Sequence, residues 1–206
     1  MEKPFEAQTQ HFIDLVSAQE IALAEKLLNE HPEIMCDRNI SGETPLHWMA
    51  IENQVAGVRM LLENGSDPHS TDYSGDSVLH SAATVGNRET IAILLSAGVP
   101  VDVPHPQSAE TALHAAARSS RDPAVIDQLI DAGANVNALD TLEWTPLHAA
   151  AMLRNIATAE RLLERGANAS QIGGFGERPL DMVNGPERPA WEALFARFDC
   201  GDKADD

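Results

Sequence analysis

The sequence predicts an all-α solenoid, in which short helix-turn-helix units stack in a row and are joined by hairpin-like fingers. The first observation is a motif of Thr or Ser, then Pro, Val or Ala, then Leu and His, which repeats at a nearly constant spacing. Its copies begin at Thr44, Ser77, Thr111 and Thr145, with a relic at Arg178, so the steps are 33, 34, 34 and 33 residues. The second observation is a composition of 43% hydrophobic but only 4% aromatic residues, which favours close-packed helices over a sandwich or barrel.

Each copy of the motif predicts the start of the first helix of its unit. Thr and Ser are favoured cap residues, and Pro stands at the first helical position in two copies, where its missing N–H costs nothing. The Leu and the residue three positions later are apolar in every clear copy and form the expected buried stripe. These pairs are Leu46 and Met49, Leu79 and Ala82, Leu113 and Ala116, and Leu147 and Ala150.

A second helix follows in each unit, for example in VAGVRMLLENG and ATAERLLERG, with apolar positions three and four residues apart. It ends near a glycine that suits the left-handed backbone of a helix C-terminus, at Gly65, Gly98, Gly133 or Gly166. The polar connection to the next motif contains turn signals such as DYSG at residues 72–75 and predicts a hairpin-like finger.

The residues GETPLH at Gly42 to His47, the Leu-Leu pairs, GANVNALD at Gly133 to Asp140 and the period near 33 resemble ankyrin repeats. Degenerate units are expected at both ends, because a terminal repeat has one neighbour only. Phe12 and Leu15 replace the first-helix Leu and Ala at one end, and PAWEALFARF forms the closing helix at the other. We expect a single domain over residues 1–206, with an N-terminal cap at 5–37, four clear repeats at 38–172, a C-terminal cap at 173–199 and a flexible acidic tail at 200–206.

The repeated histidines raise the question of whether they form a chemical site or have one structural role. They are His47, His80, His114 and His148. Equivalent positions of a solenoid stand one repeat apart, roughly 8–10 Å, whereas shared metal ligands lie about 2 Å from one ion. The resemblance implies that each histidine ties the start of its helix to the backbone of the neighbouring finger. We therefore expect no catalytic residues, no metal site and no cofactor.

The net charge of −18, from 14 basic and 32 acidic residues, would repel nucleic-acid phosphates and anionic lipids. Binding to nucleic acid or to membranes is therefore not expected, and the acidity fits either solubility or a basic partner. No signal peptide and no membrane-spanning run is found. Cys36 and Cys200 would lie too far apart in a linear array for a disulfide, and two free thiols predict a cytoplasmic protein.

The resemblance implies that a partner protein binds along a concave face made by the finger tips and the exposed side of the first helices. Large rings at solvent-facing finger positions are typical of interface anchors, and helical spacing adds a second row on the first helices. The candidate partner-binding residues are Trp48, Ile51, Tyr73, Arg118, Trp144, Met152 and Phe175. The alternative is that some of these side chains pack under the fingers.

Two departures from the regular spacing lie close together. The finger VPHPQS carries one extra residue, since Gly98 to Thr111 spans 13 residues where the equivalent gaps span 12. The connection RSSRDPAV is also one residue longer, and Asp122 with Pro123 is placed to cap the helix that follows. Such insertions in solenoids often lie on the binding face, but exposed loops also tolerate them at little cost.

The leading hypothesis is a non-enzymatic module that binds another protein, alone a monomer, and acts as an inhibitor, adaptor or scaffold. An enzyme or small-ligand receptor on the same scaffold is the first alternative, and it would require perturbed ionisable groups around His69, Asp102 and His105. A structural array that self-associates through an exposed end is the second alternative.

Overall fold

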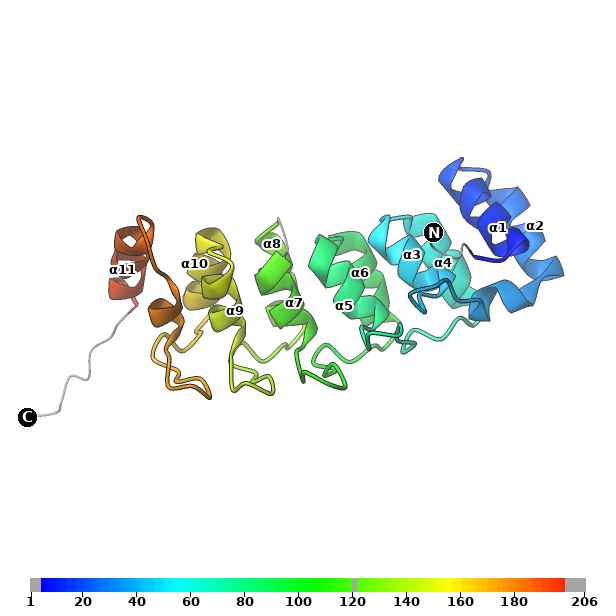
Figure 1. Ribbon diagram of the computed structural model, residues 1–206. Coiled ribbons are helices and arrows are strands. Elements are labelled where there is room, and N and C mark those ends of the chain that lie inside the picture. Colours follow the sequence, from blue (N-terminus) through cyan, green and yellow to red (C-terminus); the bar gives the residue numbers. More distant parts are fainter. Residues whose placement is uncertain (1–4, 120–121, 199–206) are drawn as a thin grey trace, which may run out of the picture.

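The computed structural model describes residues 5–119 and 122–198, and the described chain is a row of stacked helices (Figure 1). Its only assigned β-structure is an isolated bridge between Thr71 and Ser77. The predicted all-α solenoid is therefore confirmed. Cys200, the tail at 200–206 and residues 120 and 121 of the lengthened connection lie outside the described residues. Within the described ranges, no helix is both long and apolar enough to cross a membrane.

The helices form pairs that follow one another along the chain, with 3₁₀ turns in the two end units. They are α1 (Ala7–Ser17), α2 (Ile21–Glu30), η1 (Pro32–Cys36), α3 (Pro45–Ile51), α4 (Val55–Glu63), α5 (Val78–Val85), α6 (Arg88–Ser96), α7 (Ala112–Ser119), α8 (Ala124–Asp131), α9 (Pro146–Met152), α10 (Ile156–Glu164), η2 (Pro179–Met182) and α11 (Arg188–Ala196).

The first helices begin at the residues that the motif predicts. Thr44 and Thr145 form a capping box with the histidine three residues later, and Ser77 accepts a hydrogen bond from the backbone N–H of His80. The second helices end before glycines with positive φ, such as Gly133 at 96°, where a side chain would strain the backbone. Asp122 Oδ1 accepts the N–H of Ala124 at 3.0 Å, but Pro123 is the residue directly before α8, so the helix begins one residue later than the expected Asp122 cap with Pro123 in the first helical position.

The core runs along the whole row between the helix pairs. The motif leucines Leu46, Leu79, Leu113 and Leu147 are all buried. Ala82, Ala116 and Ala150 follow them on the same stripe, and the neighbouring first helices contact each other more extensively than the second helices do. The first helices therefore lie closer to one another along the row than the second helices do.

The two ends of the core are closed by large side chains, as the end units require. Phe12 and Leu15 are buried in α1, and Trp191, Leu194 and Phe195 are buried in α11. Phe198 is partly buried, with the guanidinium of Arg197 5.3 Å from its ring centre. Cys36 is exposed and carries a free thiol.

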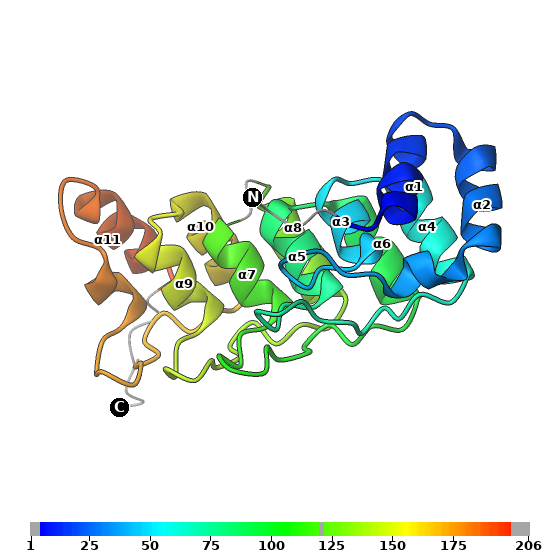
Figure 2. The ribbon, with the colours of Figure 1, turned by 45° about the vertical axis from the view of Figure 1, so that its right-hand side comes forward.

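The fingers all project from the same edge of the helical row (Figures 1 and 2). Backbone hydrogen bonds join neighbouring fingers: Tyr73 N–H donates to Ser41 O at 2.9 Å, Thr141 N–H to Ser108 O at 2.8 Å and Gly174 N–H to Leu142 O at 2.8 Å. These bonds join the first finger to the second, the third to the fourth and the fourth to the fifth, while Gly75 of the second finger lies against Pro106 and Gln107 of the third.

Candidate functional site

The four motif histidines connect each first helix to the finger of the following repeat. In the third clear repeat, the backbone N–H of Thr111 donates to His114 Nδ1 at 3.1 Å, so Nδ1 carries no proton. The proton is then on Nε2, which donates to the carbonyl oxygen of Trp144 at 3.1 Å. His47, His80 and His148 reach Asp76 O, Glu110 O and Glu177 O at 3.3, 3.0 and 3.4 Å. The structural role implied by the resemblance is confirmed.

The electrostatics of these histidines fit that role. Burial lowers the pKa of His47, His80, His114 and His148 below the usual 6.5, and the hydrogen bond to the finger carbonyl opposes the effect in each case. The neutral ring is the form that can accept at Nδ1 and donate at Nε2 at the same time. In the described part of the chain, no three His, Cys, Asp or Glu side chains are grouped to hold a metal ion.

A polar side chain at the start of each of the first four fingers fixes the shape of the turn, whereas the last finger has Gly173 at this position. Asp140 Oδ1 accepts the N–H groups of Leu142 and Trp144, both at 2.8 Å, and Asp72 Oδ1 accepts those of Ser74, Gly75 and Asp76. His105 takes this place in the lengthened finger, where Nδ1 accepts the N–H groups of Gln107 and Ser108 at 3.3 and 3.2 Å. The extra residue thus widens the turn around a histidine anchor.

Two of the three residues of the enzyme hypothesis make structural contacts through their side chains. His105 holds its own turn, and Asp102 accepts the backbone N–H of Asn135 in the next repeat at 3.0 Å. The third residue, His69, is exposed to solvent. The hydrogen bonds of His105 and Asp102 give these two side chains a structural role.

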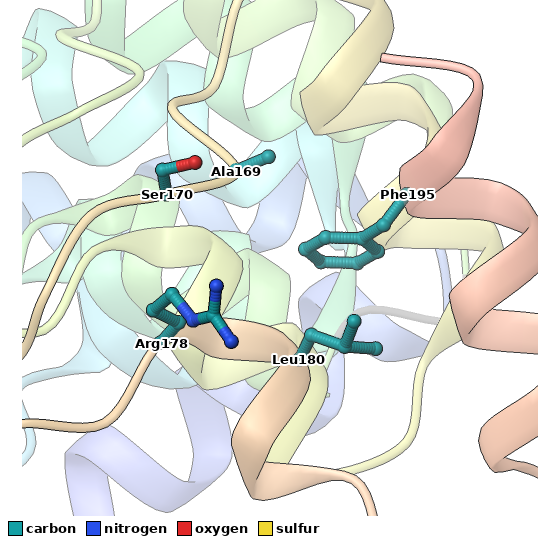
Figure 3. Close-up of a pocket in the computed structure, with 5 residues that line it drawn as sticks. All are labelled: Ala169, Ser170, Arg178, Leu180 and Phe195. Carbon is teal, nitrogen blue, oxygen red and sulfur yellow. The ribbon is translucent and has the colours of Figure 1, made fainter. Parts of the chain in front are cut away.

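A small cavity lies between the last clear repeat and the C-terminal cap (Figure 3). Its volume is about 50 Å³, and it is lined by Ala169, Ser170, Arg178, Leu180 and Phe195. Arg178 is ion-paired within its own unit, because its Nε donates to Asp181 Oδ2 at 3.1 Å. Pockets for small organic ligands usually measure roughly 300–1,000 Å³. This cavity therefore does not suit a receptor for such molecules.

Three of the seven candidate partner-binding side chains are exposed. Tyr73 and Phe175 stand at finger tips with 71% and 78% of their surface exposed, and Met152 at the end of α9 is 40% exposed. Ile51 and Arg118 are half-buried on α3 and α7, and Arg118 is ion-paired with Glu110 at 2.9 Å. The seven candidates therefore do not form one open patch.

The rings of the two tryptophan candidates are both partly covered. Trp144 lies against Gly173 of the next finger, its Nε1–H donates to Glu177 Oε1, and its ring is parallel to that of His148, 6.4 Å away. Trp48 is half-buried and packs edge-on against Phe5, with ring centres 6.2 Å apart. A free interface anchor and a packed ring have the same sequence signal, and here neighbouring residues of the fold cover the rings.

The candidate set omits three exposed apolar residues close to Phe175. Leu139, Leu142 and Ile172 are 47%, 40% and 57% exposed on the last two fingers. The signal that could have found them is their spacing, since Leu139 and Ile172, like Leu142 and Phe175, are separated by one repeat of 33 residues.

Comparison with known proteins adds a family model and several relatives. The model for ankyrin repeats (three copies) matches residues 13–105 and 99–172. The chain is 32% identical over 147 residues, 71% of its length, to a Danio rerio protein named as a palmitoyltransferase, ZDHHC13. It is 33% identical over 141 residues (68%) to neurogenic locus notch homolog protein 1 of Mus musculus, and 34% identical over 110 residues (53%) to protein PhlB of Serratia liquefaciens. It spans 23%, 6% and 48% of these relatives, respectively.

Proposed function

Because this chain belongs to the ankyrin-repeat family, whose members generally mediate protein–protein interactions, we propose that it is a non-enzymatic module that binds a partner protein through its fingers and concave face. It would act by binding alone, as an inhibitor, adaptor or scaffold, and by itself it would be a monomer. The family assignment gives the class of function, while the partner is a matter for experiment.

The observation that carries the proposal is the exposure of Tyr73 and Phe175 on fingers whose shape is fixed. Asp72 Oδ1 fixes the turn that carries Tyr73, and the finger that carries Phe175 is held by main-chain hydrogen bonds from Gly173 N–H to Glu177 O and from Gly174 N–H to Leu142 O. Rigid fingers lose little conformational entropy when a partner binds, which lowers the free-energy cost of binding. Exposed aromatic rings supply the contact area.

The non-enzymatic part of the proposal rests on how the ionisable groups are used. The neutral motif histidines are committed at both ring nitrogens, and His105 and Asp102 bond to backbone N–H groups. The strongly negative charge supports a protein partner rather than nucleic acid or an anionic membrane. A reducing, cytoplasmic location is part of the same proposal, and the exposed thiol of Cys36 supports it.

The test is affinity capture from a lysate of the source cells at physiological salt, followed by mass spectrometry. The bait proteins are the full chain, a Tyr73→Ala/Phe175→Ala variant and a Leu23→Ala control, because Leu23 is 53% exposed on α2, away from the fingers. A protein that binds the full chain and the control but not the double variant supports the proposal. Equal capture by all three baits, or by none, contradicts it.

A further inference from the structure

We infer that the apolar side chains on the last two fingers form a docking site for a basic, apolar segment of the partner protein. This inference rests on the proposed function and states where on the array the partner protein binds. The site, here named the C-terminal finger strip, consists of Leu139, Leu142, Ile172 and Phe175. It lies on the fingers between α8 and α9 and between α10 and η2, which are neighbours in both views (Figures 1 and 2).

The strip is a departure from the pattern that the chain itself sets in its earlier fingers. At the position directly before the turn anchor, the earlier fingers have Arg38, Thr71 and Pro104, whereas the last two have Leu139 and Ile172. Two residues after the anchor, the earlier fingers have Ser41, Ser74 and Gln107, whereas the last two have Leu142 and Phe175. The scaffold therefore does not require apolar residues at either position.

These side chains are placed side by side by the backbone of the two fingers. Gly174 N–H donates to Leu142 O at 2.8 Å, and a Cβ at Gly174 would lie only 2.9 Å from that oxygen. Asp140 fixes the first finger by accepting from Leu142 N–H, and Trp144 fixes the second by donating to Glu177. The strip is thus ordered before any partner arrives, which lowers the entropy cost of binding.

Exposed apolar residues in a contiguous group usually mark an interaction surface. The four members of the strip are between 40% and 78% exposed, and Phe175 is the most exposed of the large apolar side chains among the described residues. Burying an aromatic ring and neighbouring aliphatic groups is the usual source of affinity at the centre of a protein interface. Polar and charged groups then form the rim.

The charges around the strip indicate the kind of partner. Its rim carries the exposed carboxylate of Glu143 and the half-buried carboxylate of Asp140, and the nearest cation by sequence, Arg178, is ion-paired with Asp181. A second copy of the chain would bring a net charge of −18 against the same charge, which opposes self-association. A segment with lysine or arginine beside its apolar residues would instead be attracted to the rim.

The experiment pans a displayed library of random 12-residue peptides against the full chain. Enriched peptides are then synthesised, and their affinity is measured by fluorescence anisotropy for the full chain, a Leu142→Ser/Phe175→Ser variant and a Leu153→Ser control. Leu153 is an exposed apolar residue at the end of α9, outside the strip. Circular dichroism and thermal melting verify that all three proteins are equally folded.

The expected result is a set of peptides with net positive charge and aromatic or aliphatic residues, which bind the control normally and the double variant at least tenfold more weakly. Their affinity should also fall as NaCl is raised from about 50 to about 500 mM, because salt screens charges at the rim. Enrichment of neutral or acidic peptides, equal binding to the double variant, or no enrichment overturns the inference. A dimer of the full chain that the double variant abolishes also overturns it.

The two proposals fail in different ways. If the lysate experiment captures a protein that the Leu142→Ser/Phe175→Ser variant binds as well as the full chain does, the proposed function stands and the strip is not the docking site. If no protein is captured and no peptide is enriched, both proposals fall.

Discussion

His114 donates from Nε2 to the carbonyl oxygen of Trp144 at 3.1 Å, so the first helix of one repeat is fixed to the finger of the next. The same contact is made from His47, His80 and His148. Since Nδ1 of the same ring binds the Thr or Ser at the start of the helix, one side chain caps its helix and joins two repeats.

Replacing His114 by Ala should lower the free energy of unfolding by about 2–4 kcal/mol. The change leaves a cavity in the core and removes the partner of both the Thr111 N–H and the Trp144 carbonyl. Denaturation in urea, followed by circular dichroism, measures the effect. The matched control is His11→Ala, since His11 is exposed on α1; equal losses in the two variants would contradict the role given to His114.

Stability should fall as the pH is lowered from 7 through the ordinary histidine pKa of about 6.5. The motif histidines are neutral in the folded chain and have lowered pKa values, whereas in the unfolded chain they take up protons near the ordinary value of 6.5. The unfolded state therefore binds more protons in this range, and acid favours it. Urea midpoints measured at several pH values test the slope.

The control for the pH dependence is a His114→Gln variant, which removes one titrating ring and should make the slope shallower. A His69→Gln variant should leave the slope unchanged, because His69 is exposed on a connection. A stability curve that stays flat between these pH values would contradict the assignment of the four rings as neutral and buried.

Trp144→Phe should lower the free energy of unfolding by about 1–2 kcal/mol, because it removes the N–H that donates to Glu177 but keeps a ring. In the variant, Glu177 Oε1 loses the hydrogen bond from Trp144, and Oε2 is already buried without a partner among the described residues. Tyr73→Phe is the control, because the Tyr73 side chain is largely exposed and this change should have almost no effect. Urea denaturation of both variants gives the comparison, and a Trp144→Phe value equal to that of the control would show that this hydrogen bond adds nothing.

Gly174→Ala should destabilise the chain by about 1 kcal/mol, because the added Cβ would lie 2.9 Å from the carbonyl oxygen of Leu142 and force the last two fingers apart. Thr141→Ala is the matched control, since Thr141 occupies the same position of the preceding finger and is exposed. Amide hydrogen exchange of residue 174 should become faster in the Gly174→Ala variant. Unchanged exchange would mean that the fingers absorb the methyl group without moving.

The fold could be predicted from the sequence because each repeat carries its own local signals. The Thr or Ser cap, the Leu of the buried stripe and the glycine after the second helix recur at one period, and the structure has helices at these places. The role of the histidines followed from the family resemblance, and their 33- to 34-residue spacing excluded a shared metal site.

The candidate surface was harder to predict, because exposure depends on the neighbouring repeat. Trp144 is covered because its neighbour is Gly173, which leaves room for the indole, and Trp48 is covered because Phe5 folds back from the N-terminal cap. Neither contact has a signal within the motif. Leu142 has no aromatic ring that would indicate an interface anchor, although Phe175 occupies the same place one repeat later.

The histidine contacts also give the array a direction. Each clear repeat depends on a carbonyl of the unit that follows it, and none of these rings reaches back toward the unit before. At the last unit the dependence stops, since Asp181 accepts the N–H of Arg178 as a histidine would but extends no further. Removing one repeat after another from the C-terminal side therefore leaves a buried histidine ring without its carbonyl acceptor at every step. Removing repeats from the N-terminal side leaves no histidine ring without its acceptor.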